Sequence, residues 1–134
     1  MRISLKDRAR RIKLKGNDNF KDLLGIQLLE VKECYAKMQM KITKEHVNFH
    51  GFTHGGAIFS LADCAFAEAV NFGGKPAVAV QVSINFLKPT SEGDVLTAEA
   101  VCVSEGRTFG LYNITIRKEN KTVAVFSGLA YKQP

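Results

Sequence analysis

Hydrophobic and polar positions change their spacing several times along the chain, and each change marks a predicted element. Apolar residues within 17–25 have helical spacing, with capping residues before them and Gly25 after them, which predicts a short helical turn. Residues 26–43 alternate in places and predict two strands or one long bent hairpin. Residues 44–53 mix polar residues, aromatics and a glycine without any period, so we expect an ordered loop there.

The most apolar segment covers residues 57–70, where 11 of 14 residues are apolar. The exceptions are Ser60, Asp63 and Glu68. A helix that is apolar on every side has to be buried. Thr53 is a suitable N-cap, and Gly73 and Gly74 are suitable terminators, so the sequence predicts a helix over residues 54–72.

The rest of the chain has the period of two that is typical of strands. Valine, isoleucine and phenylalanine alternate with small or polar residues from 78 to 86, and the pattern ends at Lys88 and Pro89. We expect this strand and three later ones to form an uninterrupted antiparallel meander. The later strands are predicted at 94–104, 109–118 and 122–131, with turns at 91–94, 105–107 and 119–121.

One long apolar helix and five or six strands can bury the helix only if the sheet curls around it. We therefore predict an α+β hotdog fold: a curved antiparallel sheet wrapped around one long apolar helix, with an N-terminal helical segment. A single sheet with one helix leaves a second face and its edges exposed, so we expect two copies to pair into a continuous sheet.

Composition and charge divide the chain into two parts. It has 134 residues, 46% of them hydrophobic, which fits one globular domain. Residues 1–16 hold seven Lys or Arg and one acidic residue, whereas residues 17–134 hold 12 basic and 12 acidic residues. We therefore separate a basic N-terminal helical segment, 1–16, from a neutral domain, 17–134. The basic segment is open to three interpretations: a solvated amphipathic helix, a phosphate-contacting arm or a transit peptide.

The neutral domain argues against a basic nucleic-acid-binding face, and no apolar run approaches the length of a membrane span. Cys34, Cys64 and Cys102 include no CxxC pair. They fit thiols of a reducing cytoplasm better than a disulfide framework or a zinc finger. We therefore expect a cytoplasmic protein with no nucleic-acid partner and no membrane partner.

Polar residues of the apolar helix are the first candidates for chemistry. Asp63 and Ser60 are three residues apart and share a helical face, and a buried carboxylate without a partner is costly. Asp63 is therefore either satisfied by neighbouring backbone or hydroxyl donors, or it is a base or nucleophile in a cleft. His54, Gly55 and Gly56 stand at the helix start, where unpaired N–H groups meet the positive end of the helix dipole.

The Gly55 N–H is placed to polarise a carbonyl oxygen, although a Gly-Gly pair also occurs in ordinary turns. Gly55 and Asp63 are eight residues apart, about 12 Å along one helix, whereas an attacking water must lie about 3 Å from the polarised carbonyl. One helix cannot supply both groups to one site. Two antiparallel helices across a twofold axis can, and this predicts a homodimer with two equivalent sites.

Metal and cofactor sites are not expected. His46, His50 and His54 recur every four residues, but Gly51 and the expected cap at Thr53 place them in a loop rather than on a helix. The run Gly73, Gly74, Lys75 lacks the preceding glycine and the following hydroxyl residue of a phosphate-binding loop. We therefore predict chemistry that needs neither metal nor cofactor.

The segment NFHGFTHGGAIFSLAD at 48–63, continued by CAFAEAVN, closely resembles hotdog-fold acyl-CoA thioesterases of the phenylacetate-degradation PaaI type. The similarity continues through VAVQVSINFLKP, GDVLTAEA and TVAVFSGLAYK and covers roughly residues 20–132. It implies hydrolysis of an acyl-CoA thioester to free acid and CoA, with an aromatic acyl group such as phenylacetyl or hydroxyphenylacetyl. CoA is then part of the substrate, and a homotetramer is implied beyond the dimer.

The resemblance also implies roles for individual residues. Asp63 would be base or nucleophile, and the Gly55 N–H would polarise the thioester carbonyl. Asn48 would orient water, and His54 would position the thioester together with Gly56. Some relatives carry a Ser or Thr near position 79, where this chain has Ala79.

Other candidate substrate contacts are Ser83, Lys88 and Arg107. Gln81, Ser83 and Asn85 form a polar strand face that would line a channel or meet a neighbouring subunit. Lys88 and Arg107 would contact the phosphates of CoA or remain solvated turn residues. Two other functions stay open: a non-enzymatic acyl-CoA-sensing domain with 1–16 as a nucleic-acid arm, and a hotdog-fold acyl-CoA hydratase, which needs a differently placed Asp/His pair.

Overall fold

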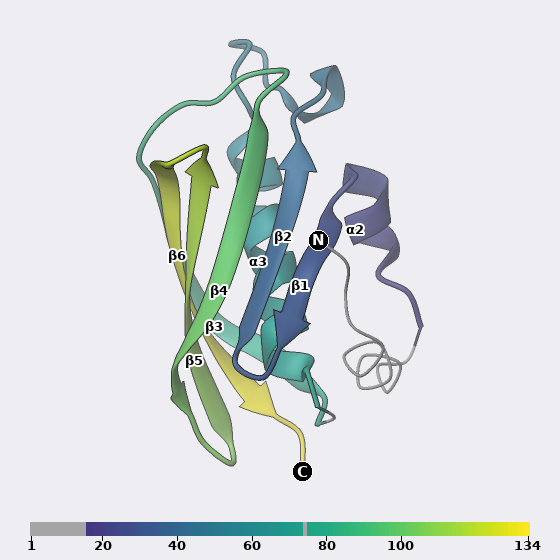
Figure 1. The fold of residues 1–134 in the computed structure, drawn as a ribbon, viewed down its shortest axis with the longest axis vertical. Helices are drawn as coiled ribbons and strands as arrows, with labels where there is room; N and C mark the ends of the chain where they lie inside the picture. Colours follow the sequence, from purple (N-terminus) through teal and green to yellow (C-terminus); the bar gives the residue numbers. More distant parts are fainter. Residues whose placement is uncertain (1–15, 74) are drawn as a thin grey trace.

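Figure 1 shows a computed structural model of the chain, which describes residues 16–73 and 75–134. A long helix, α3 (Gly55–Asn71), lies against one side of a curved six-stranded antiparallel sheet. The predicted helical segment at 1–16 lies almost entirely outside the described residues. Before α3 come α2 (Asn19–Leu24), β1 (Gln27–Lys32), β2 (Tyr35–Lys41) and the 3-10 turn η1 (Lys44–His46); after it come β3 (Ala77–Phe86), β4 (Val95–Glu105), β5 (Phe109–Lys118) and β6 (Lys121–Lys132).

The order of strands in the sheet is β1-β2-β4-β5-β6-β3. The α+β hotdog architecture is as predicted. The prediction of a four-stranded meander is wrong for its first strand, because β3 does not pair with β4. It lies at the far edge and pairs with β6, from Ala77 opposite Lys132 to Phe86 opposite Ala124. The reason is that α3 spans the sheet and carries the chain from beside β2 to the opposite edge. Only β4, β5 and β6 form a meander.

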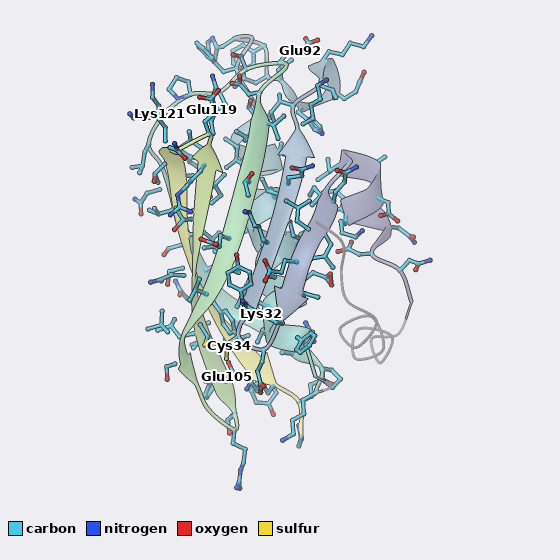
Figure 2. All side chains as sticks on the ribbon, in the orientation of Figure 1. Lys32, Cys34, Glu92, Glu105, Glu119 and Lys121 are labelled. Carbon is cyan, nitrogen blue, oxygen red and sulfur yellow. The ribbon has the colours of Figure 1, made fainter. Side chains whose placement is uncertain are left out.

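The turns of this meander lie at opposite ends of the sheet. Figure 2 labels Glu105 near the β4–β5 turn at one end, and Glu119 and Lys121 at the β5–β6 turn at the other. Glu119 adopts a left-handed backbone conformation with φ 55°, which lets a short turn connect the two strands.

The core lies between the sheet and α3. Inward positions of the strands alternate with outward ones and present small or flexible apolar side chains to the helix. Phe66 of α3 packs against Tyr112 and Phe126, directly over Gly128 of β6. A Cβ atom at Gly128 would lie 2.6 Å from a ring carbon of Phe66. The fully buried inward residues include Ala36, Met38, Met40, Leu96, Ala98, Ala100, Ile114 and Ile116.

The start of α3 differs from the prediction by one residue. His54, not Thr53, is the N-cap, and its Nδ1 accepts a hydrogen bond of 2.9 Å from the Gly56 N–H. The prediction of Thr53 is wrong because its side chain is engaged elsewhere. The Thr53 hydroxyl accepts a hydrogen bond from the Thr90 hydroxyl at 2.7 Å, and its N–H donates to the Thr90 carbonyl at 2.8 Å.

The loop before α3 is fixed by a buried histidine. His46 accepts a hydrogen bond from the Thr43 N–H at Nδ1 and donates from Nε2 to the Leu24 carbonyl, both at 2.9 Å. Its own carbonyl accepts a hydrogen bond from the His54 N–H at 2.7 Å. Through these three bonds, the end of α2 and the start of α3 are held in one arrangement. Within 16–73 and 75–134, no helix is long and apolar enough to cross a membrane.

Candidate active site

The N-terminus of α3 offers one backbone donor. The Gly56 N–H is already bonded to His54, whereas the Gly55 N–H has no acceptor among the described residues. This free donor stands at the positive end of a 17-residue helix. A Cβ atom on Gly55 would lie 3.2 Å from the ring of Phe86, so glycine leaves this position open. The arrangement can stabilise negative charge on a carbonyl oxygen.

Gly55 also lines a hollow with a volume of about 390 Å³. Most of its wall is apolar, and one positively charged side chain, Lys88, lies at its border. Phe52, Phe86 and Leu87 are each at least half exposed. An apolar group next to the Gly55 donor is therefore well accommodated. The lining residues are Phe52, Thr53, Gly55, Ile58, Phe86, Leu87, Lys88, Pro89 and Thr90.

Asp63 lies on the same helix but does not line this hollow. Its carboxyl group is partly buried, and burial raises its pKa above the usual range, with a further increase from the negative charge of Asp18. Asp18 is the N-cap of α2 and accepts a weak hydrogen bond from the neighbouring Cys64 thiol at 3.9 Å. A carboxylate with a raised pKa is a stronger base. The separation of Gly55 and Asp63 along one helix is as expected from the sequence.

Asn48 has a visible structural task. Its side-chain oxygen accepts hydrogen bonds from the N–H groups of His50 and Phe52, at 2.9 and 3.2 Å. These bonds shape the turn that leads into α3. The amide oxygen is therefore engaged, and the amide NH₂ group is what Asn48 can still offer to a water molecule.

Ser83 lies on the opposite face of the sheet. Its neighbours Val82 and Ile84 pack against the core, so Ser83 points away from α3, and it pairs with Ser127 of β6. A shallow hollow of about 300 Å³ surrounds this pair. Within one chain, the structure does not bring Ser83 and Gly55 together.

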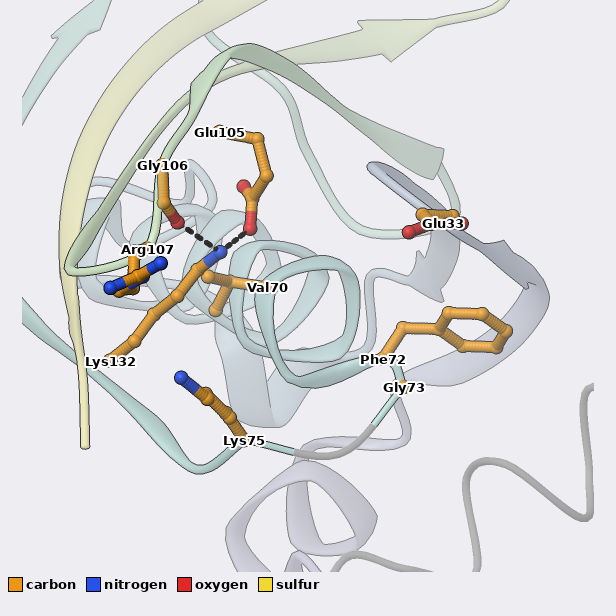
Figure 3. Close-up of a pocket in the computed structure, with 9 residues that line it drawn as sticks. All are labelled: Glu33, Val70, Phe72, Gly73, Lys75, Glu105, Gly106, Arg107 and Lys132. Atoms are coloured by element: carbon orange, nitrogen blue, oxygen red, sulfur yellow. Dashed lines mark hydrogen bonds and ion pairs between the residues drawn. The ribbon is translucent and has the colours of Figure 1, made fainter. Parts of the chain in front are cut away.

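Arg107 and Lys88 lie at opposite ends of the molecule. Arg107 lines a pocket of about 490 Å³ at the C-terminal end of α3, together with Lys75 and Lys132 (Figure 3). Lys132 forms an ion pair with Glu105 and donates a hydrogen bond of 2.8 Å to the Gly106 carbonyl. The pocket therefore holds three cationic side chains and two carboxylates, Glu33 and Glu105, and only Glu105 is paired with Lys132. Its net positive charge favours an anion near Lys75 and Arg107.

The three histidines have separate surroundings. His46 is buried in the bonds described above, His54 caps α3, and His50 is exposed beside the ring of Phe49. In the described part of the chain, no three His, Cys, Asp or Glu residues are grouped as ligands for a metal ion.

Sequence reasoning missed two neighbours of the site. Phe86 stands against Gly55, and the strict alternation of β3, which places it on the side of Val82 and Ile84, was a usable signal. Asp18 approaches the face of Asp63. No local pattern could indicate that approach, because it depends on how α2 docks on α3.

The curved sheet around one helix is the hotdog architecture, and the free backbone donor at the helix start fits the hydrolysis of a thioester. The profile of the Thioesterase superfamily matches residues 50–125, and the chain belongs to this superfamily. It is 42% identical over 117 residues to the acyl-coenzyme A thioesterase PaaI of Escherichia coli, covering 87% of this chain and 84% of that protein. It is 44% identical over 117 residues to a putative esterase of Archaeoglobus fulgidus, covering 87% of this chain and 76% of that protein.

Solved structures agree with these relationships. The E. coli PaaI protein from the phenylacetic acid degradation operon matches with a TM-score of 0.90 and 38% identity, covering 96% of this chain and 94% of that one. A hypothetical thioesterase protein of Streptococcus pneumoniae with coenzyme A matches with a TM-score of 0.77 and 28% identity, covering 81% of this chain and 88% of that one. The PaaI-type resemblance, the hotdog fold and the assignment as a hydrolase are thereby confirmed.

Proposed function

We propose that this protein hydrolyses acyl-CoA thioesters to free acid and CoA, and that the acyl group is aromatic, such as phenylacetyl or hydroxyphenylacetyl. The free Gly55 N–H beside an apolar hollow carries the proposal. Phe52 and Phe86 in its wall supply faces against which an aromatic ring can pack. The E. coli relative is an acyl-coenzyme A thioesterase by name, and it is the PaaI protein from the phenylacetic acid degradation operon.

In this mechanism, the thioester carbonyl oxygen accepts a hydrogen bond from the Gly55 N–H and becomes negatively charged as the tetrahedral intermediate forms. Asp63 either removes a proton from the attacking water or attacks the carbonyl carbon itself. The C–S bond then breaks, and the CoA sulfur leaves and takes a proton that the water gives up. Where Asp63 itself attacks, the products of this step are CoA and an acyl anhydride on Asp63, and water then hydrolyses the anhydride to free acid and the Asp63 carboxylate. Asn48 orients the water through its amide NH₂ group, and His54 holds the Gly56 backbone at the helix start.

The site is shared between two subunits in this proposal. Gly55 and the partner's Asp63 meet if two α3 helices pack antiparallel across a twofold axis. The edge strand β3 supports such pairing: among residues 16–73 and 75–134, β6 is its only neighbour in the sheet, and Val78 and Val80 are 49% and 53% exposed. An apolar open edge favours pairing with a second copy. Val101 and Val103 on the outer sheet face are also exposed, which supports further assembly into a tetramer.

The shared site is tested by complementation. Asp63→Asn and Gly55→Val are each expected to inactivate the homo-oligomer, since one lacks the carboxylate and the other obstructs the backbone donor. Coexpressed with different tags and purified as a mixed dimer, they reconstitute one complete site of two, or about half of the wild-type rate. The readout is CoA release with a thiol reagent, with each variant alone as control. A mixed dimer as inactive as its parents would place both groups in sites within one chain.

Lys88 and Arg107 are proposed to bind the phosphates of CoA. In the antiparallel dimer, α3 of the partner continues for eight residues after Asp63, which is about 12 Å. The pocket that contains Arg107 lies at that end of the helix, so the partner's pocket would lie beyond the Gly55 hollow of the first chain. The long arm of CoA can connect the two. Lys75 and Arg107 there carry the positive charge that phosphates require.

Arg107→Ala is expected to raise the KM for an aromatic acyl-CoA about tenfold, the loss of one charge-assisted hydrogen bond, with kcat nearly unchanged. The same acyl group on pantetheine lacks the nucleotide, and its hydrolysis should not change. Lys121→Ala, which removes an exposed cation at the far end of the sheet (Figure 2), is the matched control. Equal losses with both substrates would assign Arg107 a structural role instead.

A further inference from the structure

Two of the three cysteines lie side by side at one end of the sheet. Cys34 stands in the two-residue turn between β1 and β2, with a left-handed backbone at φ 62°. Cys102 stands on β4. Because Tyr35 pairs with Val101, the next position of the register sets Cys34 opposite Cys102, and the Cys102 N–H donates a hydrogen bond of 3.1 Å to the Cys34 carbonyl.

The side chains of this pair also meet. The Cys34 thiol is close enough to contribute to the raised pKa of Cys102, and both thiols are free and partly buried. Cys102 packs against the core and pairs with Tyr112 on β5. Figure 2 shows Cys34 at the end of the sheet where Lys32 and Glu105 are also labelled. Both thiols are partly buried, and only Cys102 is also packed against the core.

Backbone geometry allows a bond between the two sulfurs. Residues directly opposite each other in a hydrogen-bonded antiparallel pair have Cα atoms about 5.5 Å apart. Disulfides form over Cα separations of about 4.4 to 6.8 Å. The backbone hydrogen bond from the Cys102 N–H to the Cys34 carbonyl holds the two residues next to each other. Cys64, the third cysteine, is buried in α3 and hydrogen-bonded to Asp18.

We propose that Cys34 and Cys102 form a thiol–disulfide exchange site that reacts with low-molecular-weight disulfides and closes an intramolecular disulfide between the β1–β2 turn and β4. This site is separate from the proposed thioesterase chemistry and does not rest on it.

The reaction proceeds in two exchange steps. The Cys34 thiolate attacks one sulfur of the small disulfide, which breaks its S–S bond and releases one small thiolate. The Cys102 thiolate then attacks the Cys34 sulfur of this mixed disulfide, forms the Cys34–Cys102 bond and releases the second. The protons of the two cysteines end on the two released thiols, so the protein is oxidised and the small disulfide is reduced. Burial and the adjacent Cys34 thiol raise the pKa of Cys102 to about 11, so Cys102 stays largely protonated until the mixed disulfide on Cys34 is next to it.

Closure would join two segments that are distant in sequence and fasten one wall of a pocket. Glu33, next to Cys34, lines the pocket that contains Lys75 and Arg107. A disulfide that closes so long a loop restricts the unfolded chain and raises thermal stability. For a domain of this size, we expect the melting temperature to rise by about 10 °C.

The test exposes the reduced protein to glutathione disulfide, quenches it with acid and measures intact mass, tryptic peptides and melting temperature. Wild type and Cys64→Ser are expected to lose about 2 Da, the two thiol hydrogens, to yield a linked Cys34–Cys102 peptide and to melt higher. Cys34→Ser and Cys102→Ser are expected to form no such link and to show no rise in melting temperature.

Three results would overturn the proposal: three free thiols remaining in wild type, a glutathione adduct that persists on wild type, or a link that includes Cys64. Because peptide mapping of wild type decides these outcomes by itself, the test holds even where a serine variant folds poorly.

Discussion

Asp63→Asn is expected to lower kcat for an aromatic acyl-CoA by a hundredfold or more, on the order expected for a positioned base or nucleophile. The substitution keeps the size of the side chain and removes only its ability to take up a proton or attack. Asp63 is partly buried on α3, so an isosteric amide should leave the packing of the helix unchanged. CoA release, followed with a thiol reagent over aromatic and straight-chain acyl-CoAs, measures the loss.

Asp22→Asn is the matched control, because Asp22 is an exposed acid of α2 paired with Lys21 and has no part in the proposed chemistry. It should retain the wild-type rate. If Asp63→Asn retained more than a tenth of the rate, Asp63 would have a structural role as a hydrogen-bond acceptor and no role in catalysis. If wild type binds acyl-CoA but hydrolyses none of the panel, the acyl-CoA-sensing alternative gains support.

The pH profile gives a second readout of the same group. Asp63 works in its ionised form, so the rate falls as pH drops through its pKa, and burial places that fall above the range of an ordinary aspartate. Asp18→Asn removes the neighbouring negative charge but keeps a capping oxygen for the Lys21 N–H. The acid limb should therefore move to lower pH. A limb that stays in place would separate Asp18 from the titration of Asp63.

Gly128→Ala is expected to lower the free energy of unfolding by about 3 kcal/mol, the upper end of the usual cost of overpacking. The new methyl group would lie 2.6 Å from one carbon of the Phe66 ring and 2.9 Å from two more. Phe66 is held by Tyr112 and Phe126, so the ring has no free direction in which to move. Urea denaturation followed by circular dichroism measures the difference.

Ser127→Ala is a suitable control on the same strand, because Ser127 points to the outer face beside Ser83. Phe66→Leu combined with Gly128→Ala should destabilise by less than the sum of the single changes, since the shorter side chain relieves the contact. Unchanged stability of Gly128→Ala would mean that the helix shifts outward at little cost.

The elements themselves could be predicted because they are encoded locally. The apolar run of α3 and the alternation of β3 each place one structure on one stretch of chain. What could not be predicted depends on distant partners. His54 caps α3 instead of Thr53, because the Thr53 hydroxyl is hydrogen-bonded to Thr90 of another loop. The position of β3 beside β6 follows from the path of α3 across the sheet, which no pattern within β3 records.

The candidate site divides in the same way. The sequence predicts Gly55 at the start of the long helix and Asp63 about two turns later, and both residues have these positions in α3. The charge of Asp18 near Asp63 and the ring of Phe86 over Gly55 arise from tertiary packing. Lys88 and Arg107 were grouped by charge, yet they lie at opposite ends of one chain, so only a second subunit could unite their contacts.

The edge position of β3 also has a kinetic meaning. Neighbours in the β4–β5–β6 meander are joined by short turns and can pair early, whereas Ala77 must find Lys132, 55 residues away. Contacts between distant residues carry a large loop-closure cost and form late in folding. By the same argument, the pairing of β2 with β4, where Tyr35 meets Val101, also forms after the meander. Both outer parts of the sheet are therefore completed late, and β3 is the late strand that the proposed dimer would pair.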